Sequence, residues 1–210
     1  VINHCVNASH KIGMSGTLKP SAKSQMIYEG YFQDQILLIT PRELIDRGYA
    51  TEVIIYPIVL HYPNKSNYKE LKDEENYLSY NQERIQFITS LIKGLYNKSE
   101  NNNTLVLFKS IEDGFWEDLY ENLKGEVEDV FVVHGKIKLK DRIEAIAKTE
   151  TKNNCLILAS FATFSTGINL KNLHNIIFVE SYKSLVKIGQ SIGRGMRKHD
   201  SKDKINIFDI

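Results

Sequence analysis

The chain has 210 residues, of which 42% are hydrophobic and 25% charged, and these proportions are typical of a globular protein. This length supports one sizeable core, or one domain with pieces of another. The formal net charge of +1 excludes a basic surface over the whole molecule, so any patch that binds nucleic acid must be local, and no apolar run is long enough to cross a bilayer.

The N-terminal part of the chain comes before any strand pattern. We expect residues 1–20 to be the end of a neighbouring domain, residues 21–52 to cross between domains, and residues 53–210 to form a second domain. The stretch "GMSGTLKP" in the first range combines small residues and hydroxyls before a proline, which is typical of a turn. The sequence starts without an initiator methionine and stops in a strand-like run, so we interpret both ends as cuts in a longer protein.

From residue 53 onward, short apolar runs alternate with helical patterns. Runs rich in β-branched and aromatic residues predict strands that are buried on both faces, as in a parallel sheet. Their alternation with helices predicts a doubly wound α/β domain with a mainly parallel sheet and helices on both faces. The polar, tyrosine-rich residues 61–80 are interpreted as an insertion or a surface excursion. The predicted strands are 53–60, 105–108, 130–133, 156–159, 176–179 and 205–208, and the predicted helices are 81–98, 112–124, 140–149 and 184–198.

Polar residues directly after the predicted strands are the first candidates for a site. In open α/β sheets, ligands bind outside the carboxyl ends of the strands. That rule selects Lys109, the His134-Gly135 pair, residues 160–169 and Glu180. Within residues 160–169, "STG" supplies two hydroxyls and a flexible backbone N–H, which suits a phosphate or a sugar-phosphate backbone. The same three residue types are also common in turns, so a simple turn is the alternative interpretation of this segment.

The predicted helix at 184–198 combines glycine with positive charge. At 100° per residue, two stripes lie about 145° apart. The apolar stripe, which we expect to pack on the sheet, contains Leu185, Ile188, Ile192 and Met196. The other stripe contains Gln190, Gly193, Arg194 and Arg197. Glycine costs about 1 kcal/mol in a helix interior, so we interpret it as room for a backbone or ligand to approach, and the paired arginines as suited to phosphate. A solvated charged face is the alternative, but it leaves the glycines unexplained.

Three segments taken together resemble motifs of superfamily 2 helicases. Ser15-Gly16-Thr17 resembles motif III, which couples the two motor domains. "STGIN" at 165–169 resembles motif V, and "QSIGRGMR" at 190–197 resembles motif VI in its Q-x-x-G-R-x-x-R form. The segments follow the order of the family, with about 25 residues between motifs V and VI. The resemblance covers nearly the whole chain and implies the C-terminal half of such an enzyme: the tail of a first RecA-like domain, a crossing segment and a second RecA-like domain.

The resemblance implies an ATP-dependent DNA helicase or translocase that remodels branched DNA in recombination, replication and repair. Branched or single-stranded DNA and the first RecA-like domain of the same protein would be its partners, and RNA is an open alternative. Nucleic acid would be bound by Ser165, Thr166, Lys109, His134 and Lys136, although "VHGK" is equally typical of a strand-end turn. ATP would be contacted by Gly167, Asn169 and Gly193, with Arg197 and Arg194 as candidate arginine fingers and Gln190 orienting the γ-phosphate or its attacking water.

The sequence departs from the family pattern in two places. It contains neither a G-x-x-x-x-G-K-[ST] loop nor an Asp-Glu-x-His box, which in this family hold ATP and Mg²⁺ on the first domain. We therefore expect the chain alone to be inactive as an ATPase. Asn169 stands where many relatives carry Asp, and this difference weakens the assignment of Asn169 to a contact with the nucleotide ribose. The alternative function is a non-catalytic RecA-like module that binds nucleic acid or a protein partner.

The remaining candidates have structural explanations. Cys5 and Cys155 are isolated, so we expect reduced thiols in a cytoplasmic setting. Phe115 and Trp116 lie in a helical pattern and are expected in the core. The histidines show no metal-ligand spacing, and we expect no metal site; they are His4, His10, His61, His134, His174 and His199. A local basic cluster is formed by Lys183, Lys187, Arg194, Arg197, Lys198, Lys202 and Lys204.

Overall fold

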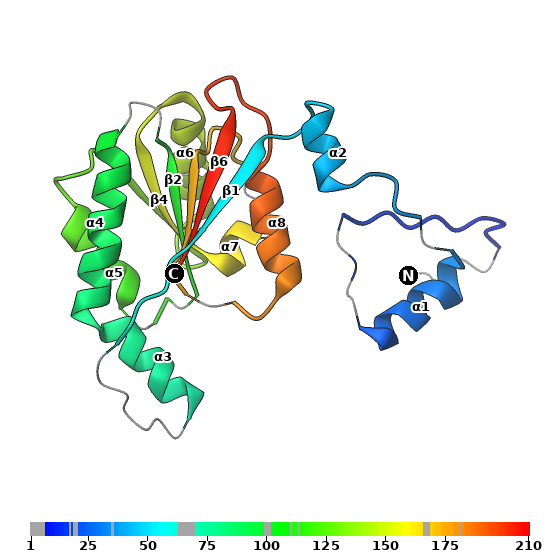
Figure 1. The fold of residues 1–210 in the computed structure, drawn as a ribbon, viewed down its shortest axis with the longest axis horizontal. Coiled ribbons are helices and arrows are strands. Elements are labelled where there is room, and N and C mark those ends of the chain that lie inside the picture. The colour runs from blue at the N-terminus through cyan, green and yellow to red at the C-terminus, as the bar shows by residue number, and fades with distance from the viewer. Residues whose placement is uncertain are drawn as a thin grey trace.

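Six parallel strands form one sheet in the computed structural model. The structure describes residues 7–16, 18, 21–34, 36–62, 70–98, 102–109, 111–112, 114–165, 169–180 and 182–210. The sheet order is β1-β6-β5-β2-β4-β3, and every neighbouring pair is parallel. The predicted doubly wound α/β fold is therefore confirmed (Figure 1). The strands are β1 (Glu52–Pro57), β2 (Thr104–Phe108), β3 (Asp129–Val133), β4 (Cys155–Ser160), β5 (Asn175–Phe178) and β6 (Lys204–Asp209).

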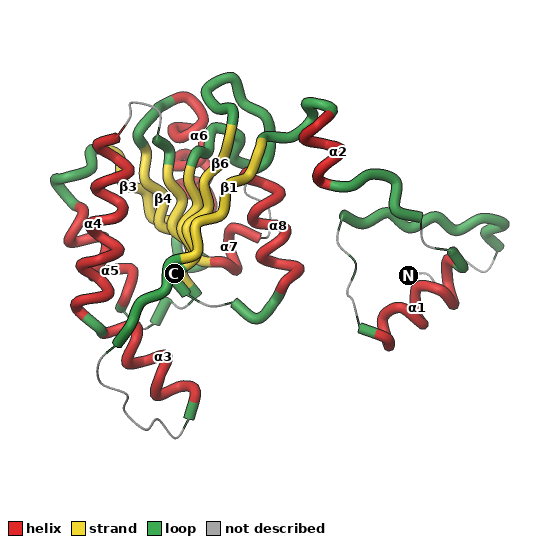
Figure 2. The backbone as a smooth tube through the Cα atoms, in the orientation of Figure 1, coloured by secondary structure: helices red, strands yellow, loops and turns green. Residues whose placement is uncertain are grey.

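Helices cover both faces of this sheet, because successive side chains of a strand point to opposite faces. Leu105 and Leu107 of β2 pack in one core with α6, α7 and α8, whereas Val106 and Phe108 pack in a second core with α4 and α5. Figure 2 shows α4 and α5 on one side of the strands and α8 on the other. These helices are α4 (Gln82–Lys98), α5 (Phe115–Leu123), α6 (Leu139–Thr151), α7 (Phe161–Ser165) and α8 (Leu185–Gly195). No helix in the described part of the chain is long and apolar enough to span a membrane.

The N-terminal segment lies apart from the sheet (Figure 1). It contains α1 (Ala22–Phe32), which has no buried residue, and α2 (Pro41–Asp46), which begins with a Thr40–Glu43 capping box. Ile36, Leu37 and Leu38 between these helices are 78–84% exposed. The sheet begins at Glu52, one residue before the predicted start of the second domain. The division into 1–20, 21–52 and 53–210 stays a prediction.

The interruption expected at residues 61–80 contains a helix, α3 (Leu71–Tyr80). Residues 63–69 lie outside the described part. The N-terminal half of α3 is exposed, and its first turn carries Asp73 and Glu74. The following Glu75 forms an ion pair with Lys109, which directly follows β2. The insertion therefore contacts the carboxyl end of the sheet.

The apolar stripe predicted for α8 is correct only in its middle. Ile188 and Ile192 pack against the core, but Leu185, the first residue of the helix, is 75% exposed, so the prediction that it packs on the sheet was wrong. The buried residues of α8 are Ser191 and Gly195. The helix also ends at Gly195, three residues earlier than predicted, because the backbone of Arg197 pairs with Ala50.

The glycines of α8 differ in what surrounds them. A Cβ atom on Gly195 would meet the Cδ1 atom of Ile205, and would lie 2.9 Å from the Cδ1 atom of Ile176. Gly195 therefore lets α8 pack closely on β5 and β6, which corrects the interpretation that every glycine here serves an external partner. Gly189 and Gly193 are exposed, and a Cβ atom on either would have nothing within 4 Å.

We predict opposite effects of alanine at these two kinds of position. Gly195→Ala should lower the free energy of unfolding by about 1–3 kcal/mol, because the added methyl group overpacks the core. Gly193→Ala should raise it by up to about 1 kcal/mol, because alanine favours the helix and meets no neighbour. Urea denaturation of the chain measures both. Equal effects would contradict the assignment of Gly195 as the packing glycine.

Candidate functional site

The two arginines of α8 lie at the amino ends of the strands. Because β5 and β6 are parallel, α8 between them must run in the opposite direction, and its last turn reaches the edge where strands begin (Figure 1). Lys109, His134 and Glu180 follow the carboxyl ends of β2, β3 and β5. The candidate residues therefore form two groups at opposite edges of the sheet. The carboxyl-end rule accounts for only one of them.

The side chain of Arg197 contacts the segment that follows α7. Its Nη1 atom donates a hydrogen bond to Oδ1 of Asn169, and both residues are exposed. The structure thus brings together one residue each from the segments that resemble motifs VI and V. An amide oxygen can accept this bond as a carboxylate would.

The backbone around Arg197 is held by the segment that leads into β1. Thr51 N donates to the carbonyl of Met196 at 2.8 Å, and Thr51 Oγ1 lies 3.5 Å from the carbonyl of Arg197. Ala50 forms an antiparallel bridge with Arg197. Carbonyl groups at a helix end have no partner within the helix. Residues 50–51 supply those partners and so determine where Arg197 leaves α8.

Arg194 is half-buried one helical turn before Arg197. Burial lowers the pKa of its guanidinium, and the positive charge of Arg197 lowers that pKa further. Two guanidinium groups that repel each other favour an anion between them, and their planar forks match phosphate oxygens. Gln190 and Gly193 of the same stripe are exposed.

Lys202 belongs to the local basic cluster of the sequence, which we expected to lie on the surface with Arg194 and Arg197. That prediction was wrong, because Lys202 is only 8% exposed. Its Nζ atom donates to the carbonyl of Gly195 at 2.6 Å and to that of Leu173 at 2.9 Å. Burial lowers its pKa to about 8, and the negative charge of Glu150 opposes this shift. The run of charged residues around Lys202 gave no signal for its burial.

A second group that the sequence analysis missed fixes the loop between Asn169 and β5. The Asn103 amide donates to the carbonyls of Thr149 and Asn172 at 3.0 and 2.8 Å, and its Oδ1 accepts from the backbone N of Cys155 at 2.8 Å. Ser201 Oγ donates to Asn172 Oδ1 at 2.7 Å. This buried network ties the loop to β2, β4 and α6.

At the carboxyl edge, Lys109 is already engaged by carboxylates. Its Nζ atom lies 2.6 Å from Glu75 of α3, and its backbone N donates to the side chain of Glu180. Burial lowers the pKa of the Arg84 guanidinium, the negative charge of Glu180 opposes this shift, and the guanidinium donates to the carbonyl of Val179. A phosphate group that binds Lys109 must compete with Glu75.

His134 is buried and 4% exposed, with its ring 5.1 Å from that of Trp116. Burial lowers the pKa of its imidazole, and the charges of Lys136 and Arg142 lower it further. Its Nδ1 atom accepts from the backbone N of Lys136 at 3.3 Å. The imidazole therefore shapes a turn, and Gly135 and Lys136 are the exposed residues there.

Several predicted site residues cannot be placed in detail. Thr17, Thr166 and Gly167 lie outside the described residues, and Ser165 is the last residue of α7. Ser15 and Gly16 are exposed in the N-terminal segment. Among the described residues, no group of three or more His, Cys, Asp or Glu side chains could hold a metal ion.

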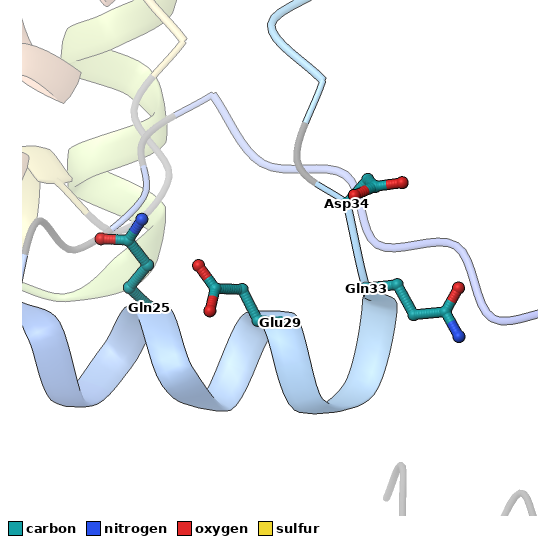
Figure 3. A pocket seen from close by; sticks show the side chains of 4 residues that line it. All are labelled: Gln25, Glu29, Gln33 and Asp34. Carbon is teal, nitrogen blue, oxygen red and sulfur yellow. The ribbon is translucent and has the colours of Figure 1, made fainter.

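A separate hollow of about 440 Å³ lies beside α1 (Figure 3). Figure 3 shows the side chains of Gln25 and Glu29 pointing from one face of α1. None of the described residues that line it is basic. Its lining residues are Gln25, Glu29, Gln33 and Asp34.

Comparison with known proteins places this geometry in a family. The model of the helicase conserved C-terminal domain matches residues 83–199. The ATP-dependent DNA helicase UvsW of enterobacteria phage T4 is 31% identical over 214 residues, covering 100% of this chain and 42% of that protein. The crystal structure of T4 UvsW matches with a TM-score of 0.62 and 28% identity over 88% of this chain and 36% of that one.

A fragment of an HsdR subunit of a type I restriction enzyme from Vibrio vulnificus has a TM-score of 0.69 at 18% identity. It covers 91% of this chain and 38% of that one, and this likeness shows a shared fold. The chain spans about two fifths of the length of T4 UvsW. These findings confirm the helicase family predicted from the sequence.

The burial of Lys202 predicts a pH dependence of stability. Its pKa falls from 10.5 to about 8 on folding, so between these values the unfolded chain binds more protons than the folded chain. The free energy of unfolding should therefore rise with pH in that window, by up to about 1.4 kcal/mol per pH unit from this group. Lys202→Met should lack this rise.

Urea denaturation at pH 7, 8.5 and 10 measures the difference between the two proteins. Lys204→Met is the matched control, because Lys204 lies two residues further along the chain, is exposed and should follow the unsubstituted chain. Parallel curves for Lys202→Met and the unsubstituted chain would refute the predicted role of Lys202.

Proposed function

The chain belongs to the helicase conserved C-terminal domain family, and we propose that it is the second motor domain of an ATP-dependent DNA helicase or translocase. The observation that carries this proposal is the contact between Arg197 and Asn169, with Arg194 one turn away. Two guanidinium groups at one helix end suit the charge of a nucleotide phosphate. The segment that leads toward the N-terminus is bonded to the same helix end.

Arg197 and Arg194 are proposed to act on ATP that is bound by the first RecA-like domain. Phosphoryl transfer needs positive charge where negative charge develops on the γ-phosphate. When bound, Mg²⁺ supplies part of that charge, and we propose that the first domain holds it together with most of the ATP. Arg197 is the preferred arginine finger, and Gln190 orients the γ-phosphate or its attacking water. Gly193 and Asn169 contact the nucleotide, together with Gly167.

The carboxyl edge of the sheet is proposed as part of the nucleic-acid track. Lys109 and the exposed Gly135-Lys136 turn provide cations and backbone N–H groups there, and Ser165 and Thr166 provide hydroxyls. His134 would act through the turn that it shapes, because its ring is buried. Residues 15–17 would couple the first domain to these movements.

The substrate is proposed to be branched DNA, remodelled in recombination, replication and repair, with RNA as an outcome to be tested. The relative described as an ATP-dependent DNA helicase supports DNA as the substrate, and the branched form is what the family resemblance implies. If the chain is phage-encoded, it would act in the cytoplasm of the bacterial host.

The chain alone should release no phosphate from ATP, because it contains neither the phosphate-binding loop nor the Asp-Glu-x-His box.

A non-catalytic RecA-like module is the second candidate. The acidic helix α3 favours it to some extent, because Glu75 occupies Lys109 and weakens the case for a nucleic-acid track. The candidates differ in one respect: a module without a motor role has no use for Arg197 at the nucleotide. ATP hydrolysis by the complete protein therefore separates them.

Arg197→Ala in the complete protein should lower the kcat for ATP by about 10³-fold or more, the scale of arginine fingers. Its charge acts mainly on the transition state, so binding of ground-state nucleotide should change less. Affinity for DNA should change little. Arg197→Lys should lose nearly as much activity, because an ammonium group does not reproduce the planar fork. Steady-state ATPase assays measure these effects.

Lys198→Ala is the matched control for Arg197→Ala. Lys198 is the next residue, is exposed and carries the same charge, but it lies off the Gln190–Arg197 stripe. It should have a much milder effect. Near-normal kcat for Arg197→Ala, with folding checked by thermal melts, would disprove the finger assignment and leave Arg194 as the candidate.

Binding of nucleic acid by this chain should be weak and should fall steeply with salt. A few Lys and Arg contacts to phosphates release counterions. The logarithm of the binding constant then falls linearly with the logarithm of the salt concentration. Titration of single-stranded and forked DNA between 50 and 200 mM salt, roughly the range in which such contacts lose most affinity, tests this. Glu75→Gln should increase affinity, since it frees Lys109. Binding that is indifferent to salt would count against the proposed track.

A further inference from the structure

Lys202 connects the two backbone segments that carry the Arg197–Asn169 contact. Its ammonium donates at 2.6 Å to the carbonyl of Gly195, two residues before Arg197. It also donates at 2.9 Å to the carbonyl of Leu173, four residues after Asn169. One side chain therefore fixes α8 and the loop before β5 at a single point.

The cation suits the end of α8, because the carbonyls at a helix C-terminus carry partial negative charge. It is nevertheless expensive to bury, since the two acceptors of its hydrogen bonds are neutral carbonyls. The lowered pKa of Lys202 reflects this cost. A buried cation of this kind is weak evidence for stability, because an apolar side chain of similar length avoids the desolvation. What the ammonium does provide is a fixed distance between two carbonyl groups.

The turn that contains Lys202 is attached to the loop independently. Ser201 Oγ donates to Asn172 Oδ1 at 2.7 Å, and the carbonyl of Ser201 lies 3.2 Å from Nε2 of His174. The backbone N of Lys202 donates to the carbonyl of His199 at 3.2 Å, which closes the turn. Loss of the Lys202 side chain would leave the turn on the loop and release the end of α8.

We propose that Lys202 is a positioning residue for ATP hydrolysis: it holds the end of α8 against the loop after Asn169, so that the Arg197 guanidinium is fixed before nucleotide binds. Lys202 touches neither substrate nor reacting atoms in this role. The inference rests on the proposed function, because it needs Arg197 at the γ-phosphate. A displacement of about 1 Å in such a group can cost about 10²-fold in rate.

The test compares Lys202→Met with Arg197→Ala in the complete protein. Lys202→Met keeps the length of the side chain but donates no hydrogen bond. It should lower kcat by roughly 10- to 100-fold with the KM for ATP nearly unchanged, as expected for a displaced catalytic group. Lys202→Gln retains a donor and should recover part of kcat. Lys204→Met, two residues further along the chain and exposed, should leave kcat unchanged.

Two further measurements separate positioning from stability. Hydrogen exchange of the backbone amides at 194–198 of this chain should be faster in Lys202→Met, because the end of α8 is released. Leu123→Ala opens a cavity in the core on the other face of the sheet and should lower the melting temperature while retaining kcat.

The outcomes distinguish the two proposals. Loss of kcat in both Arg197→Ala and Lys202→Met, with Leu123→Ala active, supports the positioning role. Retained kcat in Lys202→Met beside an inactive Arg197→Ala overturns this inference and leaves the proposed function standing. Equal losses in Lys202→Met and Leu123→Ala also overturn it, since Lys202 would then act through stability. Normal kcat in Arg197→Ala overturns both.

Discussion

The backbone carbonyl groups at the end of α8 have no partner within the helix, and the donors that they find decide where Arg197 lies. Thr51 donates to Met196, and Lys202 donates to Gly195. One donor comes from the segment before β1 and the other from the turn before β6. The end of α8 is thus fixed by two parts of the chain that are about 150 residues apart in sequence. Because buried polar groups must be paired, movement of either segment would leave a carbonyl without a donor unless another group replaced the lost one.

The parallel direction of β4 and β5 explains why the segment between them has parts at both edges of the sheet. Ser160 ends β4 at the carboxyl edge, and Asn175 begins β5 at the amino edge. The chain between them must therefore pass from one edge of the sheet to the other, and this stretch contains both α7 and Asn169. Asn169 consequently meets Arg197 at the amino edge, while the start of α7 remains beside the ends of the strands. A segment with this course is suited to relate events at the two edges, which a loop confined to one edge could not do.

The sequence predicted the sheet well, because unbroken apolar runs such as 105–108 have few alternatives to a buried strand. It failed where distant contacts decide the outcome. The pairing of Ala50 with Arg197 ends α8 early, and no local signal announces it. Lys202 stands in a charged run in which its neighbours are solvated, so its burial follows only from the two carbonyls that it reaches. The packing role of Gly195, in contrast, was accessible: it lies three and seven residues after Ile192 and Ile188, on the buried stripe.

The position of Arg197 outside the helix has a mechanical consequence. A side chain within α8 would move only with the helix, which the core holds through Ile188, Ile192 and Gly195. Arg197 instead belongs to a bridge with Ala50, so its backbone is bonded to the segment that enters β1. That segment follows α2 and the exposed apolar residues 36–38, which lie apart from the sheet. The Thr51–Met196 bond ties this backbone to the segment before β1, while Lys202 ties the preceding residue Gly195 to the loop before β5. The backbone that carries Arg197 is thus held both from the sheet and from the segment that precedes it.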